Sequence, residues 1–369
     1  MKVAIISGDF PAITGGISDY SYILARHLAK ENTNTTIITS KNSKIKKSHL
    51  LKILPVINKW NFFCLQKINQ LLNKIKPDVI QIEFPSKSYH RHPAINFLPF
   101  YLKLKGKQNI VFTTHEFGLY TWLGKLRQLI AMLFSDKIIT VTHDDKKQLE
   151  KIFGEKVSHI NIGANIFPAK RNEKEIKKIR EKIAPNKEKI ACFFGRIAQQ
   201  KGLESLFTAL AEVAKQRPIK LLMIGEFESK EIEKKLRERI KQLGIESKIH
   251  WTGYLKGRLL SQHFYASDFC VLPFEDGLTF RRGSYLAALV HGLPIISTKT
   301  RLTPTCLKHK QNIFFVKPNN KNELTQAMKE LGENTKLQAL IKKGSTKLLP
   351  LFGWKKIAKE HLSVWRSLL

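Results

Sequence analysis

The sequence contains no apolar run long enough to cross a lipid bilayer, which takes about 18 residues or more. The apolar stretch around 129–134 falls well short of that length. The N-terminus, from Met1 to Gly8, has one basic residue and a short apolar run, so it lacks the long core of a signal peptide. We therefore expect a cytoplasmic protein without a transmembrane helix.

Cysteine is also scarce. The four cysteines, Cys64, Cys192, Cys270 and Cys306, lie far apart in the chain and form no C-x-x-C pair. This spacing argues against both a zinc site and a disulfide framework. We expect buried thiols and no metal site.

Acidic residues are few, since 30 Asp and Glu stand against 64 Lys and Arg, a formal net charge of +34. Such a charge attracts polyanions, whether nucleic acid, anionic lipid headgroups or phosphorylated substrates. A compositional bias of the genome would explain the abundance of Lys but not the shortage of Asp and Glu. Specific RNA-binding proteins carry a recognisable module such as an RRM or KH motif, and the sequence shows none. We expect no nucleic-acid partner.

The composition suits a globular protein, with 43% hydrophobic and 25% charged residues, and the length of 369 residues suggests two domains. Short β-branched apolar runs recur, each followed by a stretch with helical spacing. This alternation is typical of βαβ units and a parallel sheet. The predicted strands are 3–7, 35–39, 79–83, 110–114, 137–141 and 159–162 in the first half, and 189–194, 220–225, 249–253, 269–274, 295–297 and 312–316 in the second.

A polar, charged segment separates these two sets of strands. We predict an α/β protein of two Rossmann-like, doubly wound parallel-sheet domains that face a cleft. The domains span residues 1–166 and 188–350, the linker spans 167–187, and an amphipathic helix occupies 351–369. Sheets of this kind bind ligands outside the carboxyl ends of their strands, so two of them would make a cleft for two substrates.

Glycines or cations follow the first strand of each half. Gly15 and Gly16 precede a helical pattern, and glycines at such a turn let a backbone approach an anion, so we expect them to contact an anionic ligand. An ordinary turn explains this pair equally well. In the second half, Arg196 and Lys201 bracket the loop after the first strand and could neutralise a diphosphate. The alternative is a pair of solvated surface charges.

Short motifs follow one another in both halves. Those of the first half are Gly15-Gly16, Thr113-Thr-His115-Glu116, Val141-Thr-His-Asp144 and Ile160-Asn-Ile-Gly163-Ala-Asn165. Those of the second half are Gly195-Arg196, Lys201-Gly202, Ile224-Gly225, Trp251-Thr-Gly253-Tyr254, Ala266-Ser-Asp268, Leu272-Pro273-Phe274 and His291-Gly292-Leu293-Pro294. Over nearly the whole chain, this order resembles the retaining glycosyltransferases of family four, which have the GT-B fold. The ending Phe352-Gly-Trp354 is similar to the family's terminal helix, which crosses back to the N-terminal domain.

The resemblance implies that the first domain takes the acceptor and the second binds the donor. Arg196 and Lys201 would hold the donor diphosphate and favour departure of the nucleoside diphosphate, without a metal and with no cofactor besides the nucleotide sugar. His115 would touch the transferred sugar, although a histidine packed under a loop is the alternative. His143 and Glu83 are weaker candidates, Glu83 for contact with the acceptor.

One loop departs from the family pattern. The common members carry two glutamates, and the corresponding positions here are Thr279 and Ala287. The loop resembles a variant group in which a hydroxyl residue replaces the first glutamate. Amides at a helix start beside arginines form a phosphate cradle. We therefore expect the donor site to include Thr279, Arg281, Arg282, Gly283 and Ser284. The other residues expected to contact the donor, besides Arg196 and Lys201, are Gly15, Gly16, Glu226 and Tyr254.

These features predict a retaining glycosyltransferase that moves a sugar from a nucleotide-diphosphate donor to a glycan or lipid-linked acceptor, in cell-surface polysaccharide or glycolipid synthesis. The alternatives are an epimerase or hydrolase of sugar nucleotides on the same fold and a non-enzymatic basic protein that binds nucleic acid or membrane. Segment 41–53, with Trp60, Phe62 and Phe63, mixes cations with aromatics as peripheral membrane surfaces do. It would bind an anionic membrane at its inner face, unless it is simply a solvated basic surface.

Overall fold

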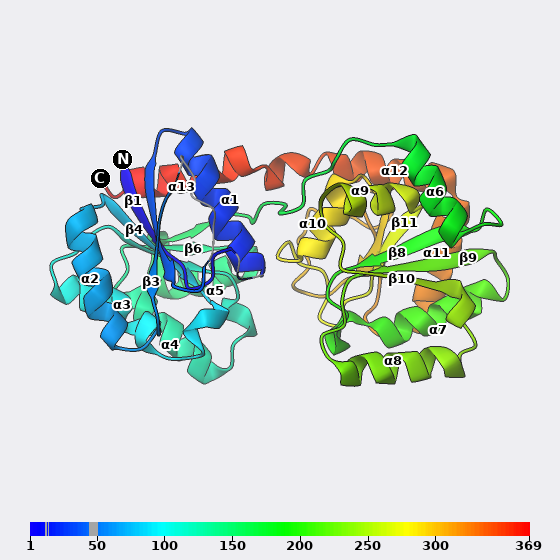
Figure 1. Cartoon of the computed structure of the whole chain (residues 1–369), viewed down its shortest axis with the longest axis horizontal. Coiled ribbons are helices and arrows are strands. Elements are labelled where there is room, and N and C mark those ends of the chain that lie inside the picture. The colour runs from blue at the N-terminus through cyan, green and yellow to red at the C-terminus, as the bar shows by residue number, and fades with distance from the viewer. Residues whose placement is uncertain (12, 14, 44–50) are drawn as a thin grey trace. The chain divides into compact units, whose positions relative to one another are not determined.

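Two parallel β-sheets organise the chain, each in its own unit (Figure 1). The computed structural model describes residues 1–11, 13, 15–43 and 51–369. Unit 1 comprises Met1–Asn165 and Leu351–Leu369, and unit 2 comprises Ile166–Pro350. The predicted fold class, two Rossmann-like parallel-sheet domains, is confirmed by these two sheets.

The sheet of unit 1 has seven strands in the order β3-β2-β1-β4-β5-β6-β7. The central strands are buried, apolar runs, as expected where both faces of a parallel sheet are covered. The strands are β1 Lys2–Ile6, β2 Asn34–Ser40, β3 Lys52–Ile57, β4 Val79–Phe84, β5 Ile110–Thr114, β6 Lys137–Thr140 and β7 Val157–His159.

Helices cover both faces of this sheet. One apolar core forms mainly between the sheet and α2, α3 and α4, and the other mainly between the sheet, α1 and α13. The helices are α1 Gly16–Lys30, α2 Phe63–Ile75, α3 Ala94–Leu104, α4 Trp122–Leu133, α5 His143–Phe153 and α13 Trp354–Arg366, with short 3-10 turns η1 Lys87–Tyr89, η2 Phe117–Leu119 and η3 Gly154–Lys156.

The last helix, α13, belongs to unit 1 although it follows unit 2 in the chain (Figure 1, red). Its apolar face is buried, and both of its tryptophans donate hydrogen bonds from their indole N–H groups. Trp354 donates to the carbonyl oxygen of Ala164, and Trp365 donates to Oε1 of Gln81 on β4, each at 2.9 Å. A Cβ at Gly163 would lie 2.3 Å from the Trp354 ring, so only glycine allows this packing.

The sheet of unit 2 has six strands in the order β10-β9-β8-β11-β12-β13. The strands are β8 Lys189–Phe194, β9 Ile219–Ile224, β10 Ile249–Gly253, β11 Phe269–Leu272, β12 Ile295–Thr298 and β13 Phe314–Val316. The helices are α6 Glu173–Ile183, α7 Leu203–Ala214, α8 Lys230–Gln242, α9 Gly257–Ala266, α10 Gly283–Val290, α11 Lys321–Glu333 and α12 Thr335–Thr346, with 3-10 turns η4 Gln199–Lys201, η5 Glu246–Lys248 and η6 Leu349–Phe352. Since all paired strands are parallel, their carboxyl ends share one edge.

Segment 167–187, expected to be a linker, contains a helix. Asn172 caps α6 by accepting a hydrogen bond from the N–H of Glu175 at 3.1 Å. Ile176 and Ile183 are buried, and Arg180 donates to the carbonyl oxygen of Ala266 at 2.6 Å. The two isoleucines are seven residues apart among charged residues, so the apolar stripe is too sparse to stand out in the sequence.

One strand was missed by the sequence analysis, and two further predictions differ from the structure. Strand β3 was not predicted, because Pro55 and flanking lysines interrupt its apolar run, and an edge strand tolerates such a proline. The strand expected at 159–162 lies at 157–159. Of the four cysteines, Cys306 is exposed rather than buried. Within the described residues, no helix has the length and apolar content needed to cross a membrane.

The anchoring of α13 predicts a site-specific loss of stability. Replacing Trp365 by Phe leaves the buried Oε1 of Gln81 without its donor, which should lower the free energy of unfolding by about 1–3 kcal/mol. Trp122→Phe, at an exposed position of α4, is the matched control and should change it by less than about 0.5 kcal/mol. Urea unfolding followed by circular dichroism measures both, and equal losses would show that the buried hydrogen bond has no effect.

Candidate functional site

Glycine turns bring the loops of unit 2 together at the carboxyl edge of its sheet. Gly225 follows β9, and Gly202 precedes α7, both with positive φ, 148° and 66°. A Cβ on Gly225 would come within 2.0 Å of the Gly195 carbonyl oxygen, and one on Gly202 within 1.9 Å of the Pro273 carbonyl oxygen. Only glycine allows these approaches, which join the loops after β8, β9 and β11.

Two cations share one phenyl ring at this edge. Lys201 Nζ lies 5.3 Å, and Arg282 Cζ 4.5 Å, from the centroid of the Phe274 ring. Arg282 also pairs with Asp276. Burial lowers the pKa of Lys201 and the positive charge of Arg282 lowers it further, while Asp276 and Glu228 act in the opposite direction. The charged form of Lys201 is therefore less stable than that of a free lysine, and an anion bound beside it would stabilise that form.

Arg196 extends from the same loop and is exposed. Its Nη1 lies 3.3 Å from Oε1 of Glu228, whose charge also acts on Lys201. The backbone N–H of Glu228 donates to the carbonyl oxygen of Ile197, and the N–H of Ile197 donates to that of Glu226, both at 2.9 Å. The Glu228 carboxylate therefore interacts with both Arg196 and Lys201, the residues predicted to bind the diphosphate. The backbone of Glu226 joins the loop after β9 to the loop after β8.

Helix α10 begins beside these cations. A Cβ at Gly195 would lie 3.6 Å from the Cβ of Ser284, so the first turn of α10 lies next to the turn after β8. The first helical hydrogen bond runs from the N–H of Leu286 to the carbonyl oxygen of Arg282, at 3.1 Å. The N–H groups of 283–285 precede it and can donate to a ligand.

The remaining predicted donor residues lie in different surroundings. The Thr279 hydroxyl is buried and, in the described part of the chain, has no hydrogen-bond partner. Ala287 is buried on α10, so no carboxylate stands there. Tyr254 is exposed at the end of the edge strand β10, which β9 separates from β8. The partly buried side chain of Arg281 makes no hydrogen bond or ion pair with the residues that the structure describes.

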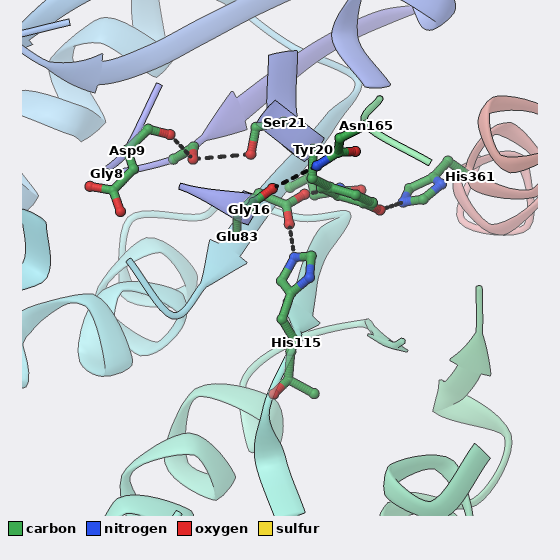
Figure 2. Close-up of polar contacts among 12 residues, drawn as sticks. Gly8, Asp9, Gly16, Tyr20, Ser21, Glu83, His115, Asn165 and His361 are labelled. Carbon is green, nitrogen blue, oxygen red and sulfur yellow. Dashed lines mark hydrogen bonds and ion pairs between the residues drawn. The ribbon is translucent and has the colours of Figure 1, made fainter. Parts of the chain in front are cut away.

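In unit 1, His115 follows β5 and is paired with a buried carboxylate. Its Nε2 lies 2.8 Å from Oε2 of Glu83, a side chain with no exposed surface (Figure 2). The amide nitrogen of Gln81 donates to the other Glu83 oxygen, and Trp365 donates to the Gln81 oxygen. Glu83, a weaker candidate for the acceptor site, is therefore inaccessible and acts by holding the His115 ring.

A second pair, from α1 and α13, packs against His115. The Tyr20 ring packs edge-on against His115, with centroids 4.8 Å apart, and its hydroxyl lies 3.0 Å from Nε2 of His361 (Figure 2). The Nδ1 of His361 donates to the carbonyl oxygen of Ile357 at 2.9 Å, so Nε2 accepts the hydroxyl proton of Tyr20. Burial lowers the pKa of His361, which favours the neutral form of this ring.

The glycine pair lies at the start of α1. Gly15 is the residue before the helix, and the carbonyl oxygen of Gly16 accepts a hydrogen bond from Nδ2 of Asn165 at 3.3 Å (Figure 2). A Cβ added to either glycine would meet nothing within 4 Å among the described atoms. The surface beside this turn is therefore open, and the turn itself does not require glycine at these positions.

His143, the other weaker candidate, pairs with a histidine and not with His115. Its ring stacks on His159 with centroids 3.8 Å apart. Burial, followed by the charge of His143, lowers the pKa of His159 to about 4. Burial lowers the pKa of His143 as well.

Sequence reasoning missed the partners that position these groups. Tyr20, Gln81 and His361 support His115, and Asp276 and Glu228 balance the cations of unit 2. A signal was present for Gln81, since a polar residue within a buried apolar strand needs a hydrogen-bonding partner. For His361 the signal was weaker, because the helical spacing places it next to the apolar face of α13 without showing a partner.

Comparisons with known proteins agree with this architecture. Residues 14–166 match the family described as Glycosyltransferase Family 4, and residues 188–334 match Glycosyl transferases group 1. A solved glycosyltransferase from Rickettsia africae is 18% identical with a TM-score of 0.80, over 100% of this chain and 98% of that one. Anabaena HepE in complex with UDP-glucose is 16% identical with a TM-score of 0.77, over 100% of both chains.

Among curated proteins, an uncharacterized glycosyltransferase from Methanocaldococcus jannaschii is 23% identical over 99% of this chain and 98% of its own. Mannosylfructose-phosphate synthase of Agrobacterium fabrum is 26% identical over 64% of this chain and 54% of its own. The fold is therefore GT-B. The chain belongs to the glycosyltransferases, with a family-four domain in its first half and a group-one domain in its second.

The His159 environment predicts an acid-sensitive stability. Because its folded pKa lies near 4 and below its unfolded value, its contribution is fully present above about pH 6.5 and is lost as the pH falls toward 4. His159→Gln should therefore reduce the loss of unfolding free energy between pH 6.5 and pH 4. Urea titrations at several pH values test this, with exposed His90→Gln as the control. An unchanged pH dependence in His159→Gln would contradict the assignment.

Proposed function

We propose that the chain transfers a sugar from a nucleoside-diphosphate donor to a glycan or lipid-linked acceptor, with retention of configuration, in the synthesis of a cell-surface polysaccharide or glycolipid. The bond between the sugar's anomeric carbon and the donor phosphate breaks, and a bond to an acceptor oxygen forms on the same face. The observation that carries the proposal is the cation cluster of Lys201 and Arg282 at the start of α10. That Anabaena HepE, a protein of the same fold, binds UDP and UDP-glucose supports a nucleotide-sugar donor.

The diphosphate is assigned to the carboxyl edge of the unit 2 sheet. Lys201 and Arg282 supply charge in a partly desolvated setting, and Arg196 supplies a planar guanidinium from the loop after β8. The N–H groups of Gly283 and Ser284, at the start of α10, would donate to phosphate oxygens. These donors stabilise the negative charge that develops on the leaving diphosphate.

Other donor contacts are assigned to the residues around this cluster. The buried hydroxyl of Thr279 is suited to bond a hydroxyl of the donor, since it lacks a partner within the described residues. Arg281, Glu226 and Tyr254 complete the proposed donor set from the surrounding loops.

His115 is assigned to the transferred sugar, on the likeness of its motif to the family's. Its Nε2 is engaged by Glu83, which leaves Nδ1 as the ring atom for a ligand contact. Gly15 and Gly16 would let the donor approach the backbone at the start of α1. Because Glu83 and Tyr20 hold the ring, His115 is presented in one orientation.

The proposed partners are the donor, the acceptor and an anionic membrane surface. Lys44, Lys46 and Lys47 of the segment first expected to bind membrane lie outside the described residues. Exposed apolar side chains on and beside α2, α3 and α4 support a membrane-facing surface, and basic residues neighbour them in the sequence. The apolar residues are Phe62, Phe63, Phe100, Leu104, Trp122, Leu123, Leu126 and Leu133.

Diphosphate binding should depend on the cations of unit 2. Lys201→Met removes one charge-assisted interaction of about 1.5–3 kcal/mol, so the affinity for UDP or another nucleoside diphosphate should fall about tenfold to a hundredfold, and Arg196→Ala should act similarly. The melting temperature of the free Lys201→Met protein should not fall, because burial and Arg282 disfavour the charge of Lys201. Calorimetry and thermal-shift measurements read these two effects separately.

Lys215→Met, at the far end of α7, is the matched control and should bind the diphosphate like the parent. If the double variant Arg196→Ala, Lys201→Met binds every tested nucleoside diphosphate with parental affinity, these residues do not hold the phosphates. The donor assignment would then be withdrawn.

Turnover should be independent of divalent metal, because cationic side chains and helix amides are proposed to stabilise the leaving diphosphate. Sugar transfer assayed with EDTA should retain the parental rate, and added Mg²⁺ or Mn²⁺ should change it little. Abolished transfer in EDTA that Mg²⁺ or Mn²⁺ restores is the opposite result and would reject this part of the mechanism.

A further inference from the structure

A cavity of about 570 Å³ lies in unit 1, beyond the carboxyl ends of β4 and β5. Its lining residues come from η1, the start of α3, η2 and the first turns of α4. The family resemblance assigned no residue of its wall to the reaction. The polar side chains that matter here are Ser86, Arg91, His92, Asn96, Glu116 and Arg127. We refer to this cavity as the α3–α4 pocket.

Two buried side chains of the pocket lack partners. The Ser86 hydroxyl and the Asn96 Nδ2 are buried, with residues 9% and 3% exposed, and neither has a hydrogen-bond partner within the residues that the structure describes. A buried polar group without a partner destabilises the fold unless something else pairs with it. Both residues line the pocket, but the Ser86 hydroxyl packs against Gly8, so a bound ligand with acceptor oxygens would pair with the Asn96 amide.

The charged groups of the pocket are mostly donors. Arg127 Nη1 donates to the carbonyl oxygen of Arg91 at 3.3 Å, which brings the two arginines to the same wall. His92 accepts the N–H of Ala94 on Nδ1 at 3.1 Å, so its Nε2 carries the hydrogen and donates. Glu116 is the one carboxylate among the lining residues, all of which are described. Donors and positive charge therefore outnumber acceptors.

Apolar and aromatic groups complete the wall. Tyr120, Leu119 and Leu123 line the same cavity, beside the arginines. Flat aromatic and aliphatic surfaces next to hydrogen-bonding groups suit a sugar ring, whose faces are apolar and whose edges carry hydroxyls. A volume of 570 Å³ is in the range of small-molecule sites.

We propose that the α3–α4 pocket binds an acceptor sugar that carries a negatively charged group, a phosphate or a carboxylate. The guanidinium groups of Arg91 and Arg127 bind the anion, and His92 and Asn96 donate to its oxygens or to neighbouring hydroxyls. Naming the ligand an acceptor rests on the proposed function, whereas anion binding by the pocket does not. The acceptor substrate is then an acidic sugar and not a neutral one.

Binding of glucose 6-phosphate, glucuronate, glucose and inorganic phosphate to the full-length protein tests this proposal by calorimetry or ligand-observed NMR. At least one acidic sugar should bind about tenfold or more tightly than glucose, and the two acidic sugars tell phosphate from carboxylate recognition. The double variant Arg91→Gln, Arg127→Gln should lose that preference. Arg26→Gln, an exposed arginine of α1 outside the pocket, should keep it.

Asn96→Leu removes the unpaired donor and keeps the side-chain size. It should weaken acidic-sugar binding severalfold without lowering the melting temperature, because the donor has no partner to lose. A lower melting temperature with unchanged binding would show that Asn96 is structural and would count against the pocket. Equal binding of acidic sugar by the parent and the double arginine variant, or no preference over glucose, would overturn the proposal.

Measuring the affinity for UDP tests the donor site of unit 2 independently of the α3–α4 pocket. The pocket variants should bind UDP like the parent, since the cation cluster is in unit 2. Loss of UDP binding in Lys201→Met with intact acidic-sugar binding supports both assignments. Parental UDP affinity in the Arg196→Ala, Lys201→Met variant would reject the donor site and leave the pocket standing.

Discussion

A carboxylate without access to water must be paired, and the buried Glu83 imposes this requirement on unit 1. One of its oxygens meets His115 and the other accepts from Gln81, which is bonded in turn to Trp365. The last helix of the chain is thereby joined to the central strand of the first sheet. The same contacts that stabilise unit 1 hold the His115 ring in place.

Unit 2 instead holds positive charges close together. Its cations are crowded at the carboxyl edge, and burial together with the charge of Arg282 opposes the charge of Lys201. Such an arrangement costs stability in the free protein and gains from a bound anion. The glycine turns at Gly202 and Gly225 make this crowding possible, because no larger residue would let the loops approach.

The α3–α4 pocket follows the same principle in unit 1, with unpaired donors in place of crowded charges. Ser86 and Asn96 are buried without partners among the described residues, and Arg91 and Arg127 add positive charge nearby. Part of the net charge of +34 is therefore concentrated at two places. These are the α3–α4 pocket of unit 1 and the loops at the carboxyl edge of the unit 2 sheet. An acidic acceptor and a diphosphate donor would both be attracted by this field.

The local sequence pattern was enough to predict the two parallel sheets, the turn that contains Arg196 and Lys201, and the position of His115 after β5. Strand periodicity and the position of a residue at a strand end depend only on neighbouring residues. The local pattern did not reveal β3, where a proline interrupts the apolar run, or α6, whose apolar stripe is sparse. Tertiary structure alone decided that Glu83 holds His115, that His361 meets Tyr20, and that Arg282 shares Phe274 with Lys201. Tyr20 and His361 are separated by 341 residues, and such pairs arise from how helices and strands pack, which a single sequence does not encode in its local spacing.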